Sequence, residues 1–182
     1  MRLLKRSFVA LDEALSNFED TGAGTLDRLA ADYVPDAGLL RHLVELAESG
    51  EVKQQIAATA LLKRYRERHI VFEANLVVRL LELIPAAQHW EATLHLLQML
   101  PQLPISPGHA DSLCDSLRDL TRHRNTFVRA WAYGGLHGLA TLYPEYRCGV
   151  APLLKRAARE EAASVRARLR QLPSLDDMPS NA

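Results

Sequence analysis

Residues 113–120 read LCDSLRDL, and they decide the fold class because their leucines at 113, 117 and 120 occupy positions i, i+4 and i+7 of one helix face. The same spacing recurs 37 residues downstream, and at one and two such steps upstream. The three resulting ladders are Leu39, Leu76, Leu113 and Val150; Leu43, Leu80, Leu117 and Leu154; and Leu46, Leu83, Leu120 and Ala157. Three parallel ladders with one step predict an internal repeat of amphipathic helices.

Each repeat is predicted to contain a second helix after a short break. Turn or capping residues mark these breaks at Ser49-Gly50, at Pro85, at Arg124-Asn125 and around Glu161. The predicted second helices are 52–68, 89–100, 126–142 and 163–172. In the second repeat, the apolar stripe Trp90, Leu94, Leu97 and Pro101 is shifted by one residue, so we expect a local irregularity there.

The chain divides into a cap, repeats and a tail. Residues 1–35 are expected to form N-terminal capping helices, because Phe8, Leu11, Leu15 and Phe18 share a helical face and a second helix fits 26–33. The repeats are placed at 36–72, 73–109, 110–146 and 147–172. Residues 173–182 have no helical pattern and are predicted to be a flexible C-terminal tail.

The second helices of the last two repeats begin with Val128-Arg129 and Val165-Arg166, followed by small residues and leucines. This pattern resembles HEAT repeats, over roughly residues 36–172. The resemblance implies an all-α, right-handed α-α superhelix of four HEAT-like helix pairs with an N-terminal helical cap. It also implies a non-enzymatic scaffold that binds a protein partner on its concave face.

Composition sets further bounds. Apolar residues make up 48% of the chain, enough for a sizeable core, and strand-favouring runs are scarce. No apolar run approaches the roughly 20 residues that cross a bilayer, so we expect a cytoplasmic protein without membrane contact. Cys114 and Cys148 are both expected to be buried as small apolar residues. The formal net charge is zero, but residues 1–50 are acidic and residues 118–172 are basic.

The charge asymmetry and the repeat together suggest a binding groove. If the second helices bury the stripe described above, their other face offers Gln55, Thr59, Glu91, His95, Arg129, Tyr133, His137, Arg166 and Arg170. The predicted partner-binding residues are Arg129, Tyr133, His137, Arg166 and Arg170, whose basic character suits an acidic segment of a protein. A solvated helix face with internal salt bridges is the alternative. For Arg129, the resemblance favours a tie to the neighbouring repeat through a carboxylate.

Other functions remain as alternatives. One is nucleic-acid binding related to HEAT-like alkylpurine DNA glycosylases, for which Trp90, Glu91, Arg129 and Trp131 are the only candidate set. The basic run 63–69 could touch a nucleic-acid backbone, although the charged end of a helix is the preferred interpretation. Self-association of the acidic end with the basic end is a third possibility. No metal, cofactor or catalytic residue is predicted, because the histidines lack ligand spacing and no nucleophile motif occurs.

Overall fold

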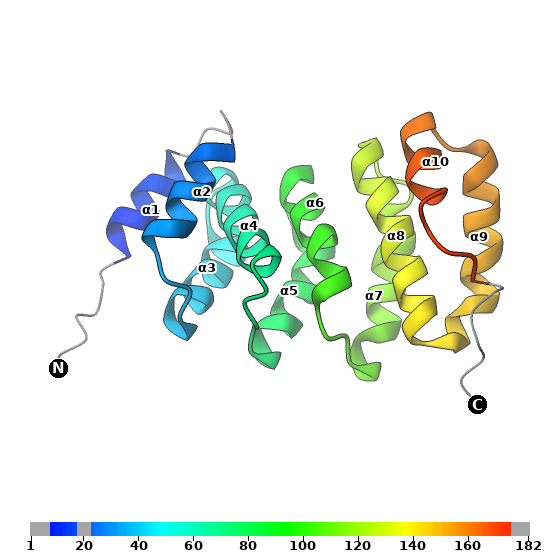
Figure 1. Ribbon diagram of the computed structural model, residues 1–182, viewed down its shortest axis with the longest axis horizontal. Coiled ribbons are helices and arrows are strands. Elements are labelled where there is room, and N and C mark those ends of the chain that lie inside the picture. Colours follow the sequence, from blue (N-terminus) through cyan, green and yellow to red (C-terminus); the bar gives the residue numbers. More distant parts are fainter. Residues whose placement is uncertain (1–7, 18–22, 176–182) are drawn as a thin grey trace.

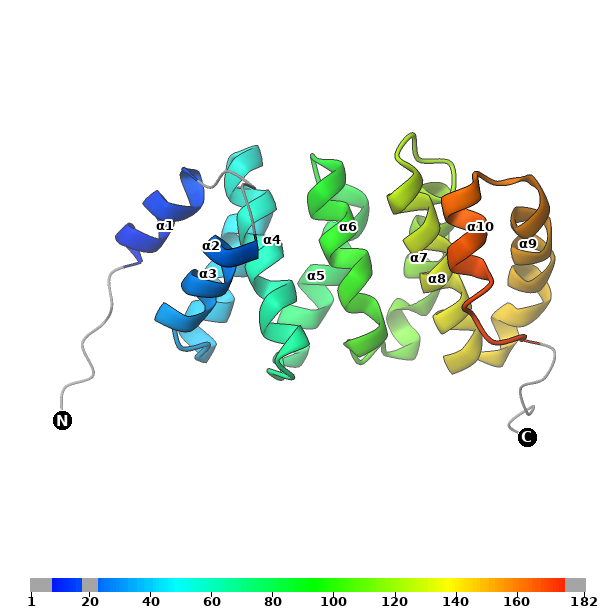
Figure 2. The same cartoon turned by 45° about the horizontal axis from the view of Figure 1, so that its top comes forward.

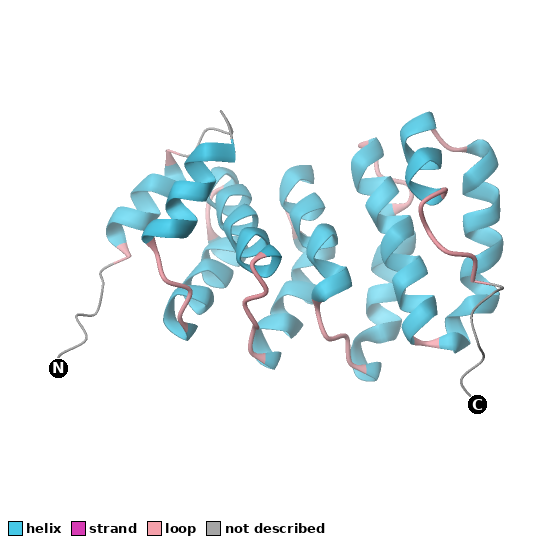
Figure 3. Ribbon diagram, in the orientation of Figure 1, coloured by secondary structure: helices cyan, strands magenta, loops and turns pink. Residues whose placement is uncertain are grey.

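The computed structural model describes residues 8–17 and 23–175, and every regular element in these residues is a helix (Figures 1 and 3). The α-helices are α1 (Val9–Ser16), α2 (Ala23–Asp32), α3 (Ala37–Ser49), α4 (Val52–Glu67), α5 (Ala74–Ala86), α6 (Trp90–Met99), α7 (Pro107–Leu120), α8 (Thr126–Leu142), α9 (Arg147–Glu160) and α10 (Ala163–Leu169). Two short 3₁₀ helices, η1 (Leu100–Gln102) and η2 (Pro144–Tyr146), follow α6 and α8. The all-α prediction is therefore confirmed.

The helices from α3 onward stack as antiparallel pairs in two layers (Figures 1 and 2). The first-helix layer contains α3, α5, α7 and α9, and the second-helix layer contains α4, α6, α8 and α10. Neighbouring helices of the second-helix layer pack along the whole stack, whereas in the first-helix layer α3 packs on α5 and α5 on α7, but α7 and α9 barely meet. The first-helix layer is thus open at its last step.

The leucine ladders form the core between the two layers. The first ladder is buried at all four of its positions, and the second is buried at Leu43, Leu80 and Leu117. Its last member, Leu154 on α9, is only partly buried, as are Leu46 and Leu120 in the third ladder. In the second ladder, packing therefore loosens only at the last pair, where α9 does not pack closely on α7.

Helix starts follow ordinary capping chemistry. The Asp36 carboxylate accepts a hydrogen bond from the Leu39 backbone N–H and begins α3, and the Asn125 side chain accepts one from Phe127 and begins α8. Pro107 occupies the first turn of α7, where its missing N–H costs no helical hydrogen bond. Asn125 lies at a break that the sequence indicated within a pair, whereas Asp36 and Pro107 lie at the starts of the first helices of their pairs.

In the second repeat the structure corrects one prediction and supports another in part. Pro85 does not break the chain, because it lies exposed in the last turn of α5, and the connection follows at Ala87. The expected irregularity is present in part: Leu97 of the shifted stripe is buried and the 3₁₀ helix η1 follows α6, but α6 also buries Leu96 and Met99, which lie 37 residues before the buried Tyr133 and Leu136. The bulky Trp90 had suggested a shifted stripe, but it is only partly buried.

The two ends of the stack are covered differently. At the N-terminal end, α1 and α2 both pack on α4, with Leu11 and Leu15 of α1 fully buried; Phe18 lies outside the described residues. At the C-terminal end, Leu175 is buried against the core, so the predicted tail begins with an ordered, packed segment. Residues 176–182 lie outside the described residues. Cys148 is exposed, which corrects the prediction that both cysteines are buried.

Candidate functional site

Two of the predicted groove residues are buried, which corrects that part of the prediction. Tyr133 is 5% exposed and His137 is 7% exposed. Tyr133 packs with Val165 and Leu169 of α10, and the His137 ring nitrogen Nε2 lies 2.8 Å from the carbonyl oxygen of Pro173. Both side chains therefore hold the last helix pair in place and are not offered to an open groove.

The other residues of that face also differ in exposure. Gln55 and Thr59 are buried, and of the predicted set only Arg170 is exposed. The remaining members are partly buried, namely Glu91, His95, Arg129 and Arg166. This face of the second helices is thus mostly an inter-helix contact, because each second helix packs against the next one.

Arg129 ties the third helix pair to the fourth. Its guanidinium Nε and Nη2 donate to the Glu161 carboxylate, with a shortest distance of 3.0 Å, and Nη1 donates to the backbone carbonyls of His123 and Arg124. The two side chains are only 17% and 16% exposed. The predicted carboxylate tie is confirmed, and every nitrogen of Arg129 takes part in an internal hydrogen bond, which leaves at most one of its five N–H donors for a ligand.

Glu161 is held in its ionised form. Burial alone would raise the pKa of this carboxyl, but hydrogen bonds from Arg129 and the Ala162 backbone, together with the positive charge of Arg129, lower the pKa below its usual value. The Tyr133 hydroxyl also donates to Glu161, at 3.3 Å. The carboxylate is therefore an internal anchor of the joint.

In the first helix pair, an uncharged side chain at the position equivalent to Arg129 makes a similar link. Gln55 lies two 37-residue steps before Arg129. Its amide nitrogen donates to the carbonyl of Ala47 at 2.8 Å, and its amide oxygen accepts from the backbone N–H of Gln88 at 2.8 Å. One side chain thus links the last turn of α3 to the α5–α6 turn, as Arg129 links the α7–α8 turn to the α9–α10 turn.

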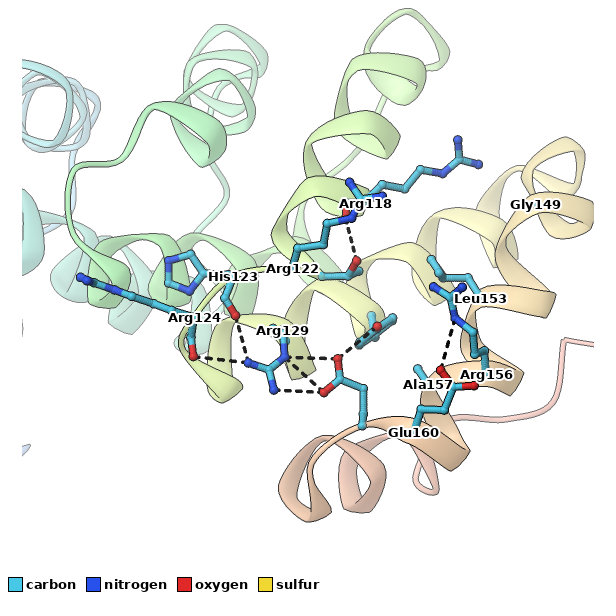
Figure 4. A pocket seen from close by; sticks show the side chains of 13 residues that line it. Arg118, Arg122, His123, Arg124, Arg129, Gly149, Leu153, Arg156, Ala157 and Glu160 are labelled. Atoms are coloured by element: carbon cyan, nitrogen blue, oxygen red, sulfur yellow. Dashed lines mark hydrogen bonds and ion pairs between the residues drawn. The ribbon is translucent and has the colours of Figure 1, made fainter.

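A cleft of about 620 Å³ opens where α7 and α9 part (Figure 4). Helices α7 and α9 form its walls, and α8 lies beneath them. The residues that line it are Arg118, Thr121, Arg122, His123, Arg124, Arg129, Tyr133, Gly149, Leu153, Arg156, Ala157, Glu160 and Glu161. Five arginines face only two carboxylates in this lining, so we name it the basic cleft.

Carboxylates neutralise the positive charge of the basic cleft only weakly. Arg156 lies 3.8 Å from Glu160, and Arg122 lies 3.4 Å from Asp119; both pairs are well exposed and add little stability. Arg118 crosses the cleft toward α9, where its Nη2 comes within 2.8 Å of the place that a Cβ on Gly149 would occupy. Figure 4 shows this extension, and it shows the Arg124 side chain extending away from the cleft.

The four residues proposed for a glycosylase-like site have separate surroundings. Arg129 is engaged by Glu161, and the Trp131 ring lies under the Arg168 guanidinium of α10 at 3.5 Å. These two positions point to different sides of α8, because two residues span about 200° of a helix. Trp90 lies beside His89 at the start of α6. The structure therefore does not bring the set together around one cleft.

The basic run 63–69 serves the fold. Lys63 and Arg64 pair with Glu67, and Arg64 also pairs with Asp27 of α2. Arg68 donates to the carbonyl of Ala30 at 2.8 Å. These contacts place the positive charges at the C-terminal end of α4, where they complement the helix dipole, and they dock α2.

The cleft-lining Arg118, Arg156 and Gly149 were not among the predicted site residues. The basic character of 118–172 pointed to this end of the molecule, but the prediction placed the site on the second helices.

Comparisons with protein-family models, with curated proteins and with solved structures give no match. In the part of the chain that the structure describes, no helix is long and apolar enough to cross a membrane. Within the same residues, no three metal-ligating side chains gather closely enough to hold an ion.

Proposed function

We propose that this protein is a non-enzymatic binding module of the HEAT-like class, a right-handed α-α superhelix that recognises an acidic segment of a protein partner. Stacked antiparallel helix pairs with a 37-residue step support this class, as does the arginine–carboxylate tie between the last two pairs. In this arrangement the more closely packed second-helix layer forms the concave side.

The observation that carries the proposal is the basic cleft. Arginine keeps its charge at any physiological pH and offers donors in a planar fork that matches a carboxylate. Arg118 and Arg156 reach into the cleft from opposite walls and make little or no use of these donors inside the protein. We therefore place the binding site between α7 and α9 rather than on the second-helix layer.

The test is fluorescence anisotropy with short glutamate-rich peptides at an ionic strength of about 0.15 M, where remote charges are screened. The test variant is the double charge reversal Arg118→Glu/Arg156→Glu, and the matched control is Arg41→Glu/Arg159→Glu, which changes the formal charge equally at exposed positions outside the cleft. We expect the test variant to lose about tenfold or more in affinity, corresponding to the loss of at least one charge-assisted contact.

The control should bind within about twofold of the unmodified protein, since rim and remote charges act mainly through screened, long-range attraction. An equal loss in both variants would contradict the proposal, because it would show a response to net charge and not to the cleft. A preference for duplex DNA over the peptides would favour the nucleic-acid alternative.

A further inference from the structure

The basic cleft contains two kinds of arginine. Arg129 is engaged internally, because four of its five N–H donors are hydrogen-bonded to Glu161 and to two backbone carbonyls. Arg118, Arg122 and Arg156 keep most of their donors available, and their two carboxylate contacts, at 3.4 and 3.8 Å, are long and solvated. The second kind is the set that a ligand would meet.

These available arginines stand on two walls. Arg118 and Arg122 lie one turn apart on α7 and its C-terminal end, and Arg156 lies on α9. Arg118 also reaches the first turn of α9 at Gly149, where the helix dipole is positive and a cation gains nothing from it. Within the described residues no carboxylate pairs with the Arg118 guanidinium. An anion between the walls would relieve this concentration of positive charge.

The placement of these arginines on two walls determines which kind of anion can contact all of them. A carboxylate is planar, carries one charge, and is satisfied by a single guanidinium in bidentate contact. A phosphate monoester carries nearly two charges and three terminal oxygens in a tetrahedral arrangement, so it can accept from arginines on both walls at once. The open cleft of about 620 Å³ can admit a phosphorylated side chain together with adjoining peptide.

Nucleic acid is the poorer source of such a phosphate. Recognition of single strands relies on exposed aromatic rings that stack on bases. The cleft lining contains no Phe or Trp. Its two rings are Tyr133, which is buried and hydrogen-bonded to Glu161, and His123, whose Nδ1 accepts a hydrogen bond from the Asn125 backbone N–H. The formal net charge of zero also gives the chain as a whole no long-range attraction for a polynucleotide backbone.

We propose that the basic cleft binds a phosphorylated serine or threonine side chain within the partner segment, held between Arg118 and Arg122 on one wall and Arg156 on the other. This inference rests on the proposed function and specifies its ligand. Arg129 and Glu161 act as positioning residues, because their ion pair joins α8 to the α9–α10 turn and thereby sets the two walls relative to each other.

The experiment compares three fluorescent peptide pools with the same randomised flanks and a fixed central serine, glutamate or phosphoserine. Each pool is titrated with the unmodified protein, with the single variants Arg118→Gln and Arg156→Gln, and with Arg159→Gln as the control on the same helix as Arg156. Inorganic phosphate and free phosphoserine are added as competitors. Thermal melting verifies that each variant remains folded, as expected for substitutions at exposed positions.

We expect the phosphoserine pool to bind about tenfold more tightly than the glutamate pool, as one additional charge-assisted hydrogen bond would give. Arg118→Gln and Arg156→Gln should each remove most of this preference, and Arg159→Gln should leave it unchanged. Free phosphoserine should compete only at much higher concentration than the peptide, because the flanking peptide contributes contacts of its own.

Three results would show whether the phosphate inference fails alone or together with the proposed function. Equal binding of the glutamate and phosphoserine pools, still sensitive to Arg118, would overturn the phosphate inference and leave the binding-module proposal standing. No binding of any pool would contradict both. Competition by inorganic phosphate as effective as that of the phosphopeptide would also overturn the inference, because it would identify a site for the free ion.

Discussion

The joint between the first and second helix pairs and the joint between the third and fourth use the same helix position in different ways. In the first, Gln55 is buried and makes neutral hydrogen bonds to both adjoining turns. In the last, Arg129 makes an ion pair with Glu161 that keeps some exposure. Full burial of an ion pair carries a large desolvation cost, so a charged tie suits a joint that water still reaches.

The surroundings of the two joints differ accordingly. Helices α3 and α5 pack together over the neutral joint, whereas α7 and α9 separate over the charged one and leave the basic cleft. One repeated framework therefore yields a closed joint that supports the stack and an open joint that can receive a ligand. The following substitutions examine this contrast, from the largest expected effect to the smallest.

Leucine truncation compares the packing of the two regions. Leu80→Ala removes a fully buried side chain in the middle of the stack, and we expect it to lower the free energy of unfolding by about 2–5 kcal/mol. Leu154→Ala, at the matching position of α9, should cost roughly half as much, because this side chain is only partly buried. Urea unfolding measures both. Equal losses would show that α9 is packed as tightly as α5.

Removal of either tie tests the contrast between neutral and charged joints. Gln55→Ala and Glu161→Gln should each cost about 1–3 kcal/mol, since each leaves partners with unsatisfied hydrogen bonds. The cost of Glu161→Gln should shrink at high ionic strength, because the ion pair is partly exposed, and that of Gln55→Ala should stay constant. The measurement is urea unfolding at low and high salt. A Gln55→Ala cost that falls equally with salt would contradict the distinction.

Two glycines of α8 compare close packing with open space. A Cβ at Gly135 would lie 2.9 Å from the Leu117 side chain of α7, so Gly135→Ala should destabilise the protein by about 1 kcal/mol through overpacking. Gly138 has no atom within 4 Å of that position, and Gly138→Ala should stabilise the helix by about 0.5–1 kcal/mol. Thermal melting distinguishes the two signs. Stabilisation by both would mean that α7 can move away from α8.

Acidification gives the smallest expected difference. The pKa of Glu161 is lowered in the folded protein, so its stabilising effect is complete above the ordinary value of 4.5 and is lost as the pH falls through the lower folded value. The stability gap between the unmodified protein and Glu161→Gln should therefore narrow below about pH 4.5. Unfolding at neutral and acidic pH measures the gap, with Gln55→Ala as the control whose gap does not change for this reason. A constant gap for Glu161→Gln would mean that its ion pair does not perturb the carboxyl.

The sequence predicted the helices well and the site only in part. The three ladders predicted the buried faces of the helices, because few folds are compatible with apolar residues that recur at helical spacing and at a 37-residue step. The Val-Arg signature likewise indicated the tie made by Arg129. The burial of Tyr133 and His137 was missed because the sequence does not show how closely successive second helices approach each other.

The basic cleft was missed for a related reason. Its walls come from α7 and α9, which belong to different repeats and share only the apolar ladder positions on their buried faces. Arg118 and Arg156 are ordinary solvent-facing residues on their own helices, and they become a site only because the first-helix layer opens between them. Such a separation depends on packing over the whole last pair, which a ladder of apolar positions does not specify.

Amide hydrogen exchange with and without a bound phosphoserine peptide tests the central claim most directly, since it shows which joint receives the ligand. We predict that binding slows exchange at the C-terminal end of α7, in the α7–α8 turn and along α9, and leaves α3 to α6 unchanged. Protection along α4 and α6 with no change at α7 and α9 would contradict the claim, because it would place the partner on the second-helix layer and make the open joint irrelevant to binding.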